Sequence, residues 1–210
     1  MDLDAGAPEP VRASEAHRAA VTLGARFEAA LLYATQVHGG QRRKGTSVPY
    51  VAHLLGVASL VLEDGGDEDE AIGALLHDAA EDQGGQDRLD DIAARFGATV
   101  ARIVDGCSDT LDSPKPPWRA RKAAYVARLE DEPSAVLRVS LADKLFNVRS
   151  IVRDVEHGGA SVWARFSAPP AELARYHRSL EAVFSRRCPG PMACQYAEVA
   201  ARLEELAGRP

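Results

Sequence analysis

Apolar side chains recur at the spacing of an amphipathic helix along most of this chain. Strand-type alternation of apolar and polar residues is absent from every segment of useful length. The pattern predicts helices at about 14–38, 49–61, 68–81, 89–96, 100–104, 118–129, 133–158, 170–187 and 192–206. With short loops between them, these segments predict an all-α domain of about eight or nine helices.

Local signals mark several of the helix boundaries. Ser14 can cap the first helix, and Pro49 suits the first turn of the second. Asp67 followed by Glu70 is typical of a capping box at the start of the third helix. Paired glycines at 65–66 and 84–85 are expected to break the chain on either side of that helix.

Length and charge limit the class of protein. The chain has 210 residues, which fits one domain able to bury a sizeable core. We interpret residues 1–13 as a flexible leader and 14–210 as the single domain. The net charge is −6, so no global basic field would recruit a nucleic-acid polymer, and no apolar run is long enough to span a membrane. An anionic small-molecule partner would need a local basic patch instead.

The three cysteines, Cys107, Cys188 and Cys194, are too few and too scattered for a disulfide framework. Sparse cysteines favour a reducing compartment, and without a signal peptide at the start of the chain they predict a cytoplasmic protein. Cys188 and Cys194 bracket the residues P-G-P-M-A with no second pair nearby, which argues against a zinc site there. The sequence assigns no role to that segment, and it is compatible with a homodimer without requiring one.

The stretch A-L-L-H-D-A-A-E-D at 74–82 places ionisable side chains on a largely apolar helix. Such groups are costly to bury unless something binds them. His77 and Asp78 stand side by side and can offer one imidazole nitrogen and one carboxylate oxygen to a metal ion. Glu81 and Asp82 follow about one helical turn later, so each of them shares a face with one member of the doublet.

Two other helices supply matching side chains. His53 lies on the second helix, one turn after Tyr50. Asp143 interrupts the apolar run of the 133–158 helix, with Asn147 four residues on and therefore on the same face. Together with the His-Asp doublet, these residues would surround one divalent ion with two imidazoles and two carboxylates. Mixed nitrogen and oxygen ligation with open positions suits Mn²⁺, Fe²⁺ or Zn²⁺ better than a closed structural zinc site.

Water in an open position of such a site has a lowered pKa, which makes hydroxide available near neutral pH. Glu81 and Asp82 would then orient or deprotonate that water, or protonate a leaving oxygen. Each element also has a simpler interpretation: an ordinary helix histidine at 53, a solvated helix end at 81–82 and a surface pair at 143–144. These three simpler interpretations would all have to be correct at once, on three separate apolar helices. We therefore prefer the metal site.

A loop punctuated by glycine precedes the second helix and carries Arg42, Arg43 and Lys44. These residues could close over phosphates, although the loop can also be interpreted as a solvated basic turn. Lys144 adds positive charge beside Asp143. In an acidic protein, basic residues gathered beside a carboxylate-rich site predict an anionic substrate.

The doublet H-D at 77–78 with the distant Asp143 resembles the HD-domain phosphohydrolase superfamily. Three blocks narrow the resemblance to the RelA/SpoT-type hydrolase domain: R-K-G-T-S-V-P-Y-V-A-H (43–53), L-L-H-D-A-A-E-D (75–82) and L-A-D-K-L-F-N (141–147). The resemblance covers about 26–187, including R-K-A-A-Y (121–125), and no room remains for an alarmone synthetase domain. The chain therefore resembles a stand-alone small alarmone hydrolase, and the fold this implies is an HD-domain helical bundle.

The resemblance also implies a reaction and a set of site residues. The reaction is metal-dependent removal of the 3′-pyrophosphate from (p)ppGpp, which leaves GDP or GTP, and Mn²⁺ is the usual ion. The implied metal ligands are His53, His77, Asp78 and Asp143, and the implied catalytic acids are Glu81 and Asp82. The resemblance matches Arg43 and Asn147 to substrate-binding positions. The full predicted substrate-binding set is Arg43, Lys44, Tyr50, Lys144, Asn147 and Tyr176.

One segment departs from the family pattern. Bacterial relatives often carry a Lys-Glu and a paired aromatic after R-F, whereas 167–177 of this chain reads S-A-P-P-A-E-L-A-R-Y-H and clearly retains only Tyr176. Substrate preference could therefore differ. The alternatives are the same metal chemistry on another nucleotide, such as NADPH, (p)ppApp or a dNTP, and a non-catalytic nucleotide sensor. The sensor is disfavoured because none of the predicted ligands or acids is lost.

Overall fold

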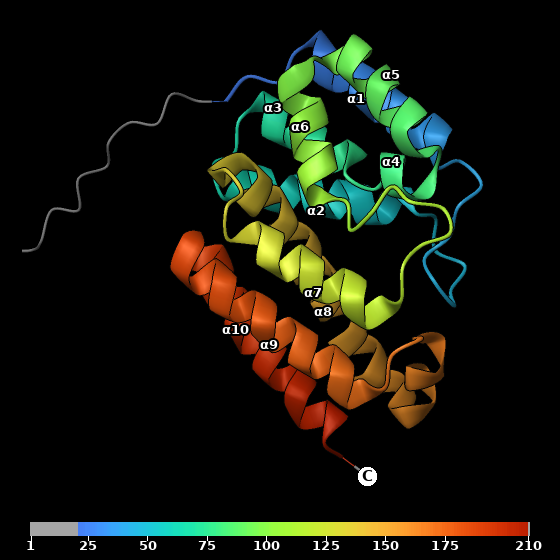
Figure 1. Cartoon of the computed structure of the whole chain (residues 1–210), viewed down its shortest axis with the longest axis vertical. Helices are drawn as coiled ribbons and strands as arrows, with labels where there is room; N and C mark the ends of the chain where they lie inside the picture. The colour runs from blue at the N-terminus through green and yellow to red at the C-terminus, as the bar shows by residue number, and fades with distance from the viewer. Residues whose placement is uncertain (1–20, 210) are drawn as a thin grey trace, which may run out of the picture.

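The longest helix, α8 (Ser134–Gly158), runs through the middle of the molecule and contacts elements from both halves of the chain (Figure 1). The structure is a computed structural model that describes residues 21–209, and within that range it contains helices and loops but no β-strand. The other helices are α1 (Ala25–Val37), α2 (Val51–Glu63), α3 (Glu68–Leu76), α4 (Ala79–Asp82), α5 (Gly85–Phe96), α6 (Ala98–Cys107), α7 (Trp118–Leu129), the 3₁₀ helix η1 (Gly159–Arg165), α9 (Pro170–Arg187) and α10 (Pro191–Ala207).

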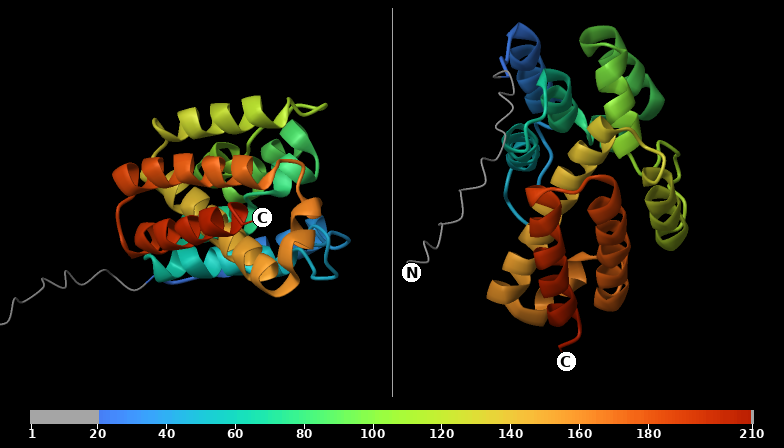
Figure 2. Two further views of the ribbon diagram at one scale, coloured as in Figure 1. Left: turned by 90° about the horizontal axis from the view of Figure 1, so that it is seen from below. Right: turned by 90° about the vertical axis from the view of Figure 1, so that its left-hand side faces the viewer.

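Helices α2, α3 and α6 pack against α8, and α1, α4 and α5 pack on these three helices. Helices η1, α9 and α10 pack along the second half of α8 (Figures 1 and 2). The burial pattern of α8 explains this arrangement. Its residues from Val139 to Leu145 are buried without interruption, which requires neighbours on every side. From Val148 onward only a one-sided stripe is buried, so this half of the helix needs cover on one face alone. The all-α prediction is confirmed.

Several predicted boundaries agree with the structure. The Asp67 side chain accepts a hydrogen bond from the Glu70 backbone N–H, and the Glu70 side chain accepts one from the Asp67 N–H, which is the expected capping box. Helices α7 and α9 have the predicted bounds, and α8 ends at Gly158. The 3₁₀ helix η1 was not predicted. No helix among residues 21–209 is both long and apolar enough to cross a membrane.

The start of the first helix was predicted wrongly. Ser14 and the proposed leader lie outside the described residues, but positions 21–24 are not helical and α1 begins at Ala25. Gly24 has an extended backbone, and its N–H donates a hydrogen bond to Oε1 of Glu68 at 2.6 Å. This contact with α3 draws the chain away from a helical path.

The predicted helix 68–81 is also interrupted, at the His-Asp doublet itself. Nδ1 of His77 lies 2.8 Å from the carbonyl oxygen of Ala74, which is the oxygen that the N–H of Asp78 would bond to in a continuous helix. The side chain competes with the backbone for that acceptor, and α3 therefore ends at Leu76 before α4 begins at Ala79. If α3 and α4 are counted together, as the sequence suggested, the described α-helices number nine.

Candidate active site

Four side chains from three parts of the fold meet at one point. Nε2 of His53 on α2 lies 3.2 Å from Nε2 of His77, in the turn between α3 and α4. Oδ1 of Asp143 on α8 lies 3.2 Å from the first of these nitrogens and 3.5 Å from the second. Oδ2 of Asp78 lies 3.4 Å and 3.0 Å from the same two atoms. The structure therefore brings together all four residues predicted as metal ligands.

The spacing of these atoms fits a shared metal ion. Ligand atoms held about 2.1 Å from one ion at tetrahedral angles lie roughly 3.4 Å from each other. Ligand atoms of His53, His77 and Asp143 all lie within 4.8 Å of one another, and the three residues are buried. Because Nδ1 of His77 is held by the Ala74 carbonyl oxygen, Nε2 is left with its lone pair facing the other ligands.

Burial disfavours the charged forms of His77, Asp78 and Asp143. The attraction between the imidazole and the carboxylates has a larger effect on their pKa values than burial has. The pKa of His77 is raised well above its usual range because the carboxylates of Asp78 and Asp143 overcome the effect of burial. The pKa of Asp143 is held well below its usual range by Lys144 and His77, again against burial. The pKa of Asp78 is lowered in the same way, chiefly by His77. The carboxylates of Asp78 and Asp143 therefore favour positive charge at the His77 imidazole, and a divalent ion bound at Nε2 would supply that charge in place of a proton.

Three residues predicted to bind substrate contact the carboxylates of Asp78 and Asp143. The Tyr50 hydroxyl donates to Oδ2 of Asp78 at 2.5 Å. Nζ of Lys144 lies 2.7 Å from Oδ2 of its neighbour Asp143, and Nδ2 of Asn147 donates to Oδ1 of Asp143 at 2.5 Å. These contacts orient the carboxylates that face the ion position.

The two predicted catalytic acids have different surroundings. Glu81 has both carboxylate oxygens engaged: Oε1 lies 2.8 Å from Nζ of Lys115, and Oε2 accepts the Asp109 N–H at 2.8 Å. Asp82 accepts a hydrogen bond at Oδ2 from Gln41, and its Oδ1 lies 3.8 Å from Nζ of Lys115. Burial, with the negative charge of Asp78 as the second cause, raises the pKa of Asp82. A raised pKa favours proton transfer near neutral pH.

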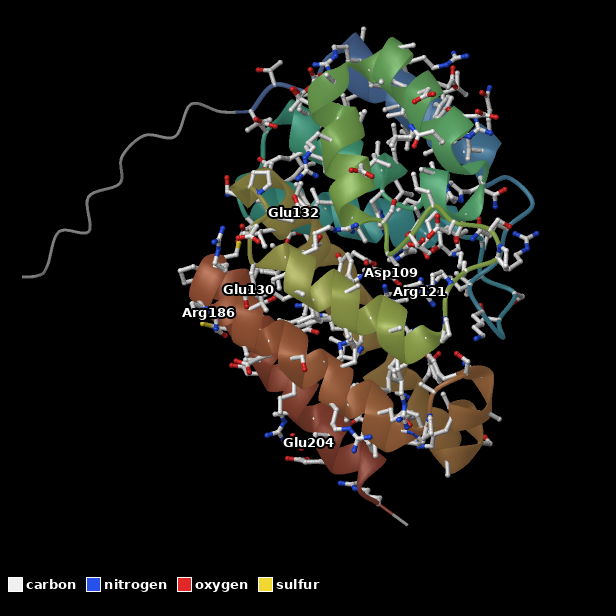
Figure 3. All side chains as sticks on the ribbon, in the orientation of Figure 1. Asp109, Arg121, Glu130, Glu132, Arg186 and Glu204 are labelled. Carbon is white, nitrogen blue, oxygen red and sulfur yellow. The ribbon has the colours of Figure 1, made fainter. Side chains whose placement is uncertain are left out.

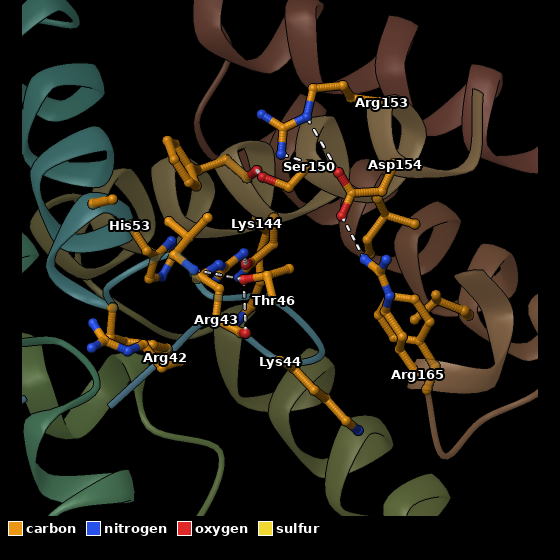
Figure 4. A pocket seen from close by; sticks show the side chains of 18 of the residues that line it. Arg42, Arg43, Lys44, Thr46, His53, Lys144, Ser150, Arg153, Asp154 and Arg165 are labelled. Carbon is orange, nitrogen blue, oxygen red and sulfur yellow. Dashed lines mark hydrogen bonds and ion pairs between the residues drawn. The ribbon is translucent and has the colours of Figure 1, made fainter. Parts of the chain in front are cut away.

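A cavity of about 590 Å³ opens beside the ligand cluster. His53 and the basic loop with Arg42, Arg43 and Lys44 line it (Figure 4), as does Asp82. The guanidinium of Arg43 donates to Oδ1 of Asn147 at 2.7 Å and lies over the rings of Tyr50 and Phe146, 5.8 and 5.9 Å from their centroids. Cation–π contacts of this kind hold the side chain against the cavity wall.

The far end of the cavity is formed by the segment that departs from the family pattern and its neighbours. Asp154 is held between Arg153, at 3.1 Å, and Arg165, at 3.0 Å (Figure 4). Tyr176 lines the same cavity, packs edge-on against Trp118 and has a hydroxyl with no hydrogen-bond partner among the described residues. Arg42, Lys44 and Lys144 also line the cavity, so most of its charged side chains are basic.

Sequence reasoning missed the group of residues that supports Glu81. Asp109 forms ion pairs with Arg121 and Lys122 of α7, and Figure 3 labels Asp109 and Arg121. Lys115 comes from the proline-containing loop that precedes that helix. The pair R-K at 121–122 belonged to a recognised block, but nothing local indicated which carboxylates these side chains would contact.

Residues 30–171 match the HD domain, a span of more than half the chain. The chain belongs to the HD domain family. Within it, the human guanosine-3′,5′-bis(diphosphate) 3′-pyrophosphohydrolase MESH1 is 35% identical over 129 residues, which cover 60% of this chain and 69% of that protein. A guanosine-3′,5′-bis(diphosphate) 3′-pyrophosphohydrolase of Aquifex aeolicus is 34% identical over 119 residues, which make up 57% of this chain but 17% of that larger protein.

Solved structures agree on the fold. A structure described as a metazoan ortholog of SpoT that hydrolyses ppGpp superposes with a TM-score of 0.70 and 24% identity, over 87% of this chain and 98% of that one. The protein lmo0812 of Listeria monocytogenes EGD-e superposes with a TM-score of 0.65 and 25% identity, over 73% of this chain and 99% of that one. The predicted HD-domain helical bundle is confirmed.

Proposed function

We propose that this protein is a metal-dependent pyrophosphohydrolase that removes the 3′-pyrophosphate from (p)ppGpp and leaves GDP or GTP. The observation that carries the proposal is the convergence of His53, His77, Asp78 and Asp143 beside a basic cavity. Over 129 residues, the chain is 35% identical to a protein named for that reaction. The alternatives raised from the sequence, other nucleotides and a sensor, have no comparable support.

The four ligand residues would hold one divalent ion, for which we propose Mn²⁺. Two imidazole nitrogens and two carboxylate oxygens form a mixed donor set that suits Mn²⁺, while Fe²⁺ and Zn²⁺ share much of this preference. When bound, the ion would lower the pKa of a water molecule and polarise a phosphoryl oxygen. Asp82 would accept the proton of that water. Glu81, which is paired with Lys115, would help to orient the water.

The basic cavity would bind the nucleotide. Arg43, already held by Asn147, presents a guanidinium that can donate two parallel hydrogen bonds to a phosphate. Lys44 and Arg42 add charge to the same rim, while Tyr176 and Trp118 offer ring faces for a base. A site with this charge selects small anionic substrates over neutral ones.

We also propose a cytoplasmic location. All three cysteines are free thiols in the structure, which fits a reducing compartment.

The direct test is turnover. Purified protein loaded with Mn²⁺ is incubated with ppGpp, and the products are separated by anion-exchange chromatography. We expect GDP and pyrophosphate in equal amounts. NADPH, ppApp and a dNTP are run in parallel, because turnover of one of them with ppGpp left intact would change the substrate but retain the chemistry.

The variant Asp78→Ala separates an enzyme from a sensor. Loss of this ligand is expected to abolish both metal content, measured by mass spectrometry, and pyrophosphate release. If wild-type protein binds ppGpp without turnover, and Asp78→Ala binds it equally well, the protein is a sensor and the enzymatic proposal is wrong.

A further inference from the structure

Gln41 reaches from the start of the basic loop to α4, where its Nε2 donates a hydrogen bond to Oδ2 of Asp82 at 2.8 Å. A carboxylate only accepts hydrogen bonds, so the amide nitrogen of Gln41 must face Asp82. The amide oxygen therefore points the other way. This orientation determines whether the residues around the amide oxygen donate or accept hydrogen bonds.

Oε1 of Gln41 has two neighbours, Nδ1 of His38 at 2.7 Å and Nε2 of Gln83 at 2.8 Å. Because this oxygen can only accept, His38 must carry its proton on Nδ1. The result is a directed chain of hydrogen bonds. His38 Nδ1–H donates to Gln41 Oε1, and Gln41 Nε2–H donates to Asp82 Oδ2.

The His38 side chain is buried and packs against Tyr50. It is 2% exposed, follows the last residue of α1, and stacks on the ring of Tyr50 with centroids 5.2 Å apart and planes 22° apart. With the proton on Nδ1, its Nε2 is a lone-pair acceptor, and this buried atom has no partner among the described residues. Leaving a buried acceptor unpaired costs about 1–3 kcal/mol. An apolar side chain would avoid that cost, which points to a role for the Nδ1 proton.

Backbone hydrogen bonds hold Gln41 beside Tyr50. The carbonyl oxygen of Gln41 accepts the Tyr50 N–H at 3.0 Å, and the N–H of Arg43 donates to the Val48 carbonyl at 2.9 Å. These bonds close the basic loop into a short hairpin. The hairpin sets Gln41 against Asp82 and Tyr50 against Asp78, so one loop orients both the acid and a metal ligand.

The two oxygens of Asp82 are thereby made different. Oδ2 is occupied by Gln41, whereas Oδ1 accepts no hydrogen bond within residues 21–209 and has Nζ of Lys115 at 3.8 Å. Asp82 also lines the cavity. We propose that His38 and Gln41 are positioning residues that turn Asp82 so that Oδ1 is left for the attacking water. This inference rests on the proposed hydrolase function. It adds two residues to the site, neither of which is a predicted metal ligand or catalytic acid, and Gln41 lines the cavity beside Asp82.

The test compares steady-state kinetics of four variants with the wild type on ppGpp. Gln41→Met removes the amide while keeping the length of the side chain. His38→Phe keeps the stacked ring but removes Nδ1–H, and His38→Asn restores a donor near the position of Nδ1. The matched control is Gln86→Met, because Nε2 of Gln86 donates to Oδ1 of Asp90 at the same 2.8 Å on the exposed surface of α5.

We expect Gln41→Met to lower kcat roughly tenfold to a hundredfold while KM stays within about twofold, because the lost contact acts on proton transfer and not on binding. Loss of the Gln41 hydrogen bond should also raise the pKa of Asp82, so the acidic limb of the kcat–pH profile should move to higher pH. His38→Phe should also reduce kcat, and His38→Asn should have a kcat closer to that of the wild type. Metal content, and ppGpp affinity of the metal-depleted protein, should remain at wild-type values.

The inference is overturned if Gln41→Met keeps wild-type kcat and pH profile, or if His38→Asn is no better than His38→Phe. A fall in metal content or in melting temperature with each kinetic loss would also overturn it, because the residues would then be structural. Failure of the proposed function looks different: wild-type protein itself would release no pyrophosphate from ppGpp.

Discussion

The hydroxyl of Tyr50 donates to Oδ2 of Asp78 at 2.5 Å, across 28 positions of sequence. Tyr50 immediately precedes α2, and Asp78 lies in the turn between α3 and α4, so the bond joins two of the three elements that carry the ligand cluster. Burial, with the charge of Asp78 as the next cause, raises the pKa of Tyr50 and keeps its proton in place for donation. Tyr50, which was expected to bind substrate, therefore orients the carboxylate of a predicted metal ligand.

Tyr50→Phe removes this hydrogen bond and leaves the ring. Outer contacts to ligand carboxylates are worth about 10–100-fold in metal affinity, so we expect a loss of that size, measured by competition with a fluorescent chelator. Tyr33→Phe is the control, because the Tyr33 hydroxyl donates to Oδ2 of Asp91 at 2.6 Å away from the cluster. Equal metal affinity in both variants would contradict the role given to Tyr50.

Glu81→Gln should cut kcat while metal occupancy stays near the wild-type level, because we propose that Glu81 acts on the water and not as a metal ligand. The structure adds a second consequence. The new amide would place N–H groups against either Lys115 or the Asp109 N–H, both of which are donors. Proteolysis of the loop between α6 and α7 should therefore accelerate. Loss of metal from this variant would show that Glu81 is a ligand.

Lys115 contributes positive charge to both acids, at 2.8 Å from Glu81 and 3.8 Å from Asp82. This charge lowers the pKa of Asp82 and partly offsets burial. In Lys115→Met the pKa of Asp82 should rise, and the acidic limb of the kcat–pH profile should move upward. Lys115→Arg should restore the wild-type limb. An unshifted limb in Lys115→Met would show that the cation does not act on Asp82.

His177 gives the folded protein a pH-dependent stability. Burial, with Lys144 and Lys122 as further causes, lowers the pKa of His177 to about 3. The unfolded chain binds this proton below about pH 6.5, whereas the folded protein does not. The stabilisation is therefore complete above about pH 6.5, and as pH falls toward 3 it is lost by up to about 1.4 kcal/mol per pH unit.

Urea unfolding at pH 7.5, 6.0 and 5.0 measures this effect. The difference in unfolding free energy between wild type and His177→Asn should shrink as pH falls, because the variant lacks the titrating group. His157→Asn, at an exposed position near the end of α8, controls for the loss of a histidine. A constant difference across the three pH values would contradict the assignment of His177 as a buried neutral side chain.

Gly56 allows α2 to approach α8 closely. A Cβ at this position would lie 2.0 Å from Cε2 of Phe146, whose ring packs against His53 at 5.2 Å between centroids. Gly56→Ala should destabilise the fold by about 1–3 kcal/mol through overpacking and lower metal affinity by displacing the ring beside a ligand. Gly40→Ala, where a Cβ meets nothing within 4 Å, should melt near the wild-type temperature. Equal melting temperatures and metal affinities in the two variants would contradict the importance of this close approach.

Most of the helices, and the residues that the structure brings together at the site, could be predicted from the amino-acid pattern alone. Helical spacing, the Asp67–Glu70 capping box and the glycine breaks act over a few residues, so their consequences could be derived without the fold. His53, the doublet at 77–78 and Asp143 were identified because ionisable groups in apolar helices require a partner. Their convergence within about 3.5 Å follows from the same requirement.

How those side chains are held in place depends on contacts between distant segments and could not be predicted locally. The break of the helix at His77 depends on a side chain competing for the Ala74 carbonyl, and α3 and α4 separate there. The contacts of Lys115 with Glu81 and of Gln41 with Asp82 span 34 and 41 positions, so no local pattern encodes them. Hydrogen bonds at these distances depend on the relative placement of whole helices, which packing of the core around α8 determines.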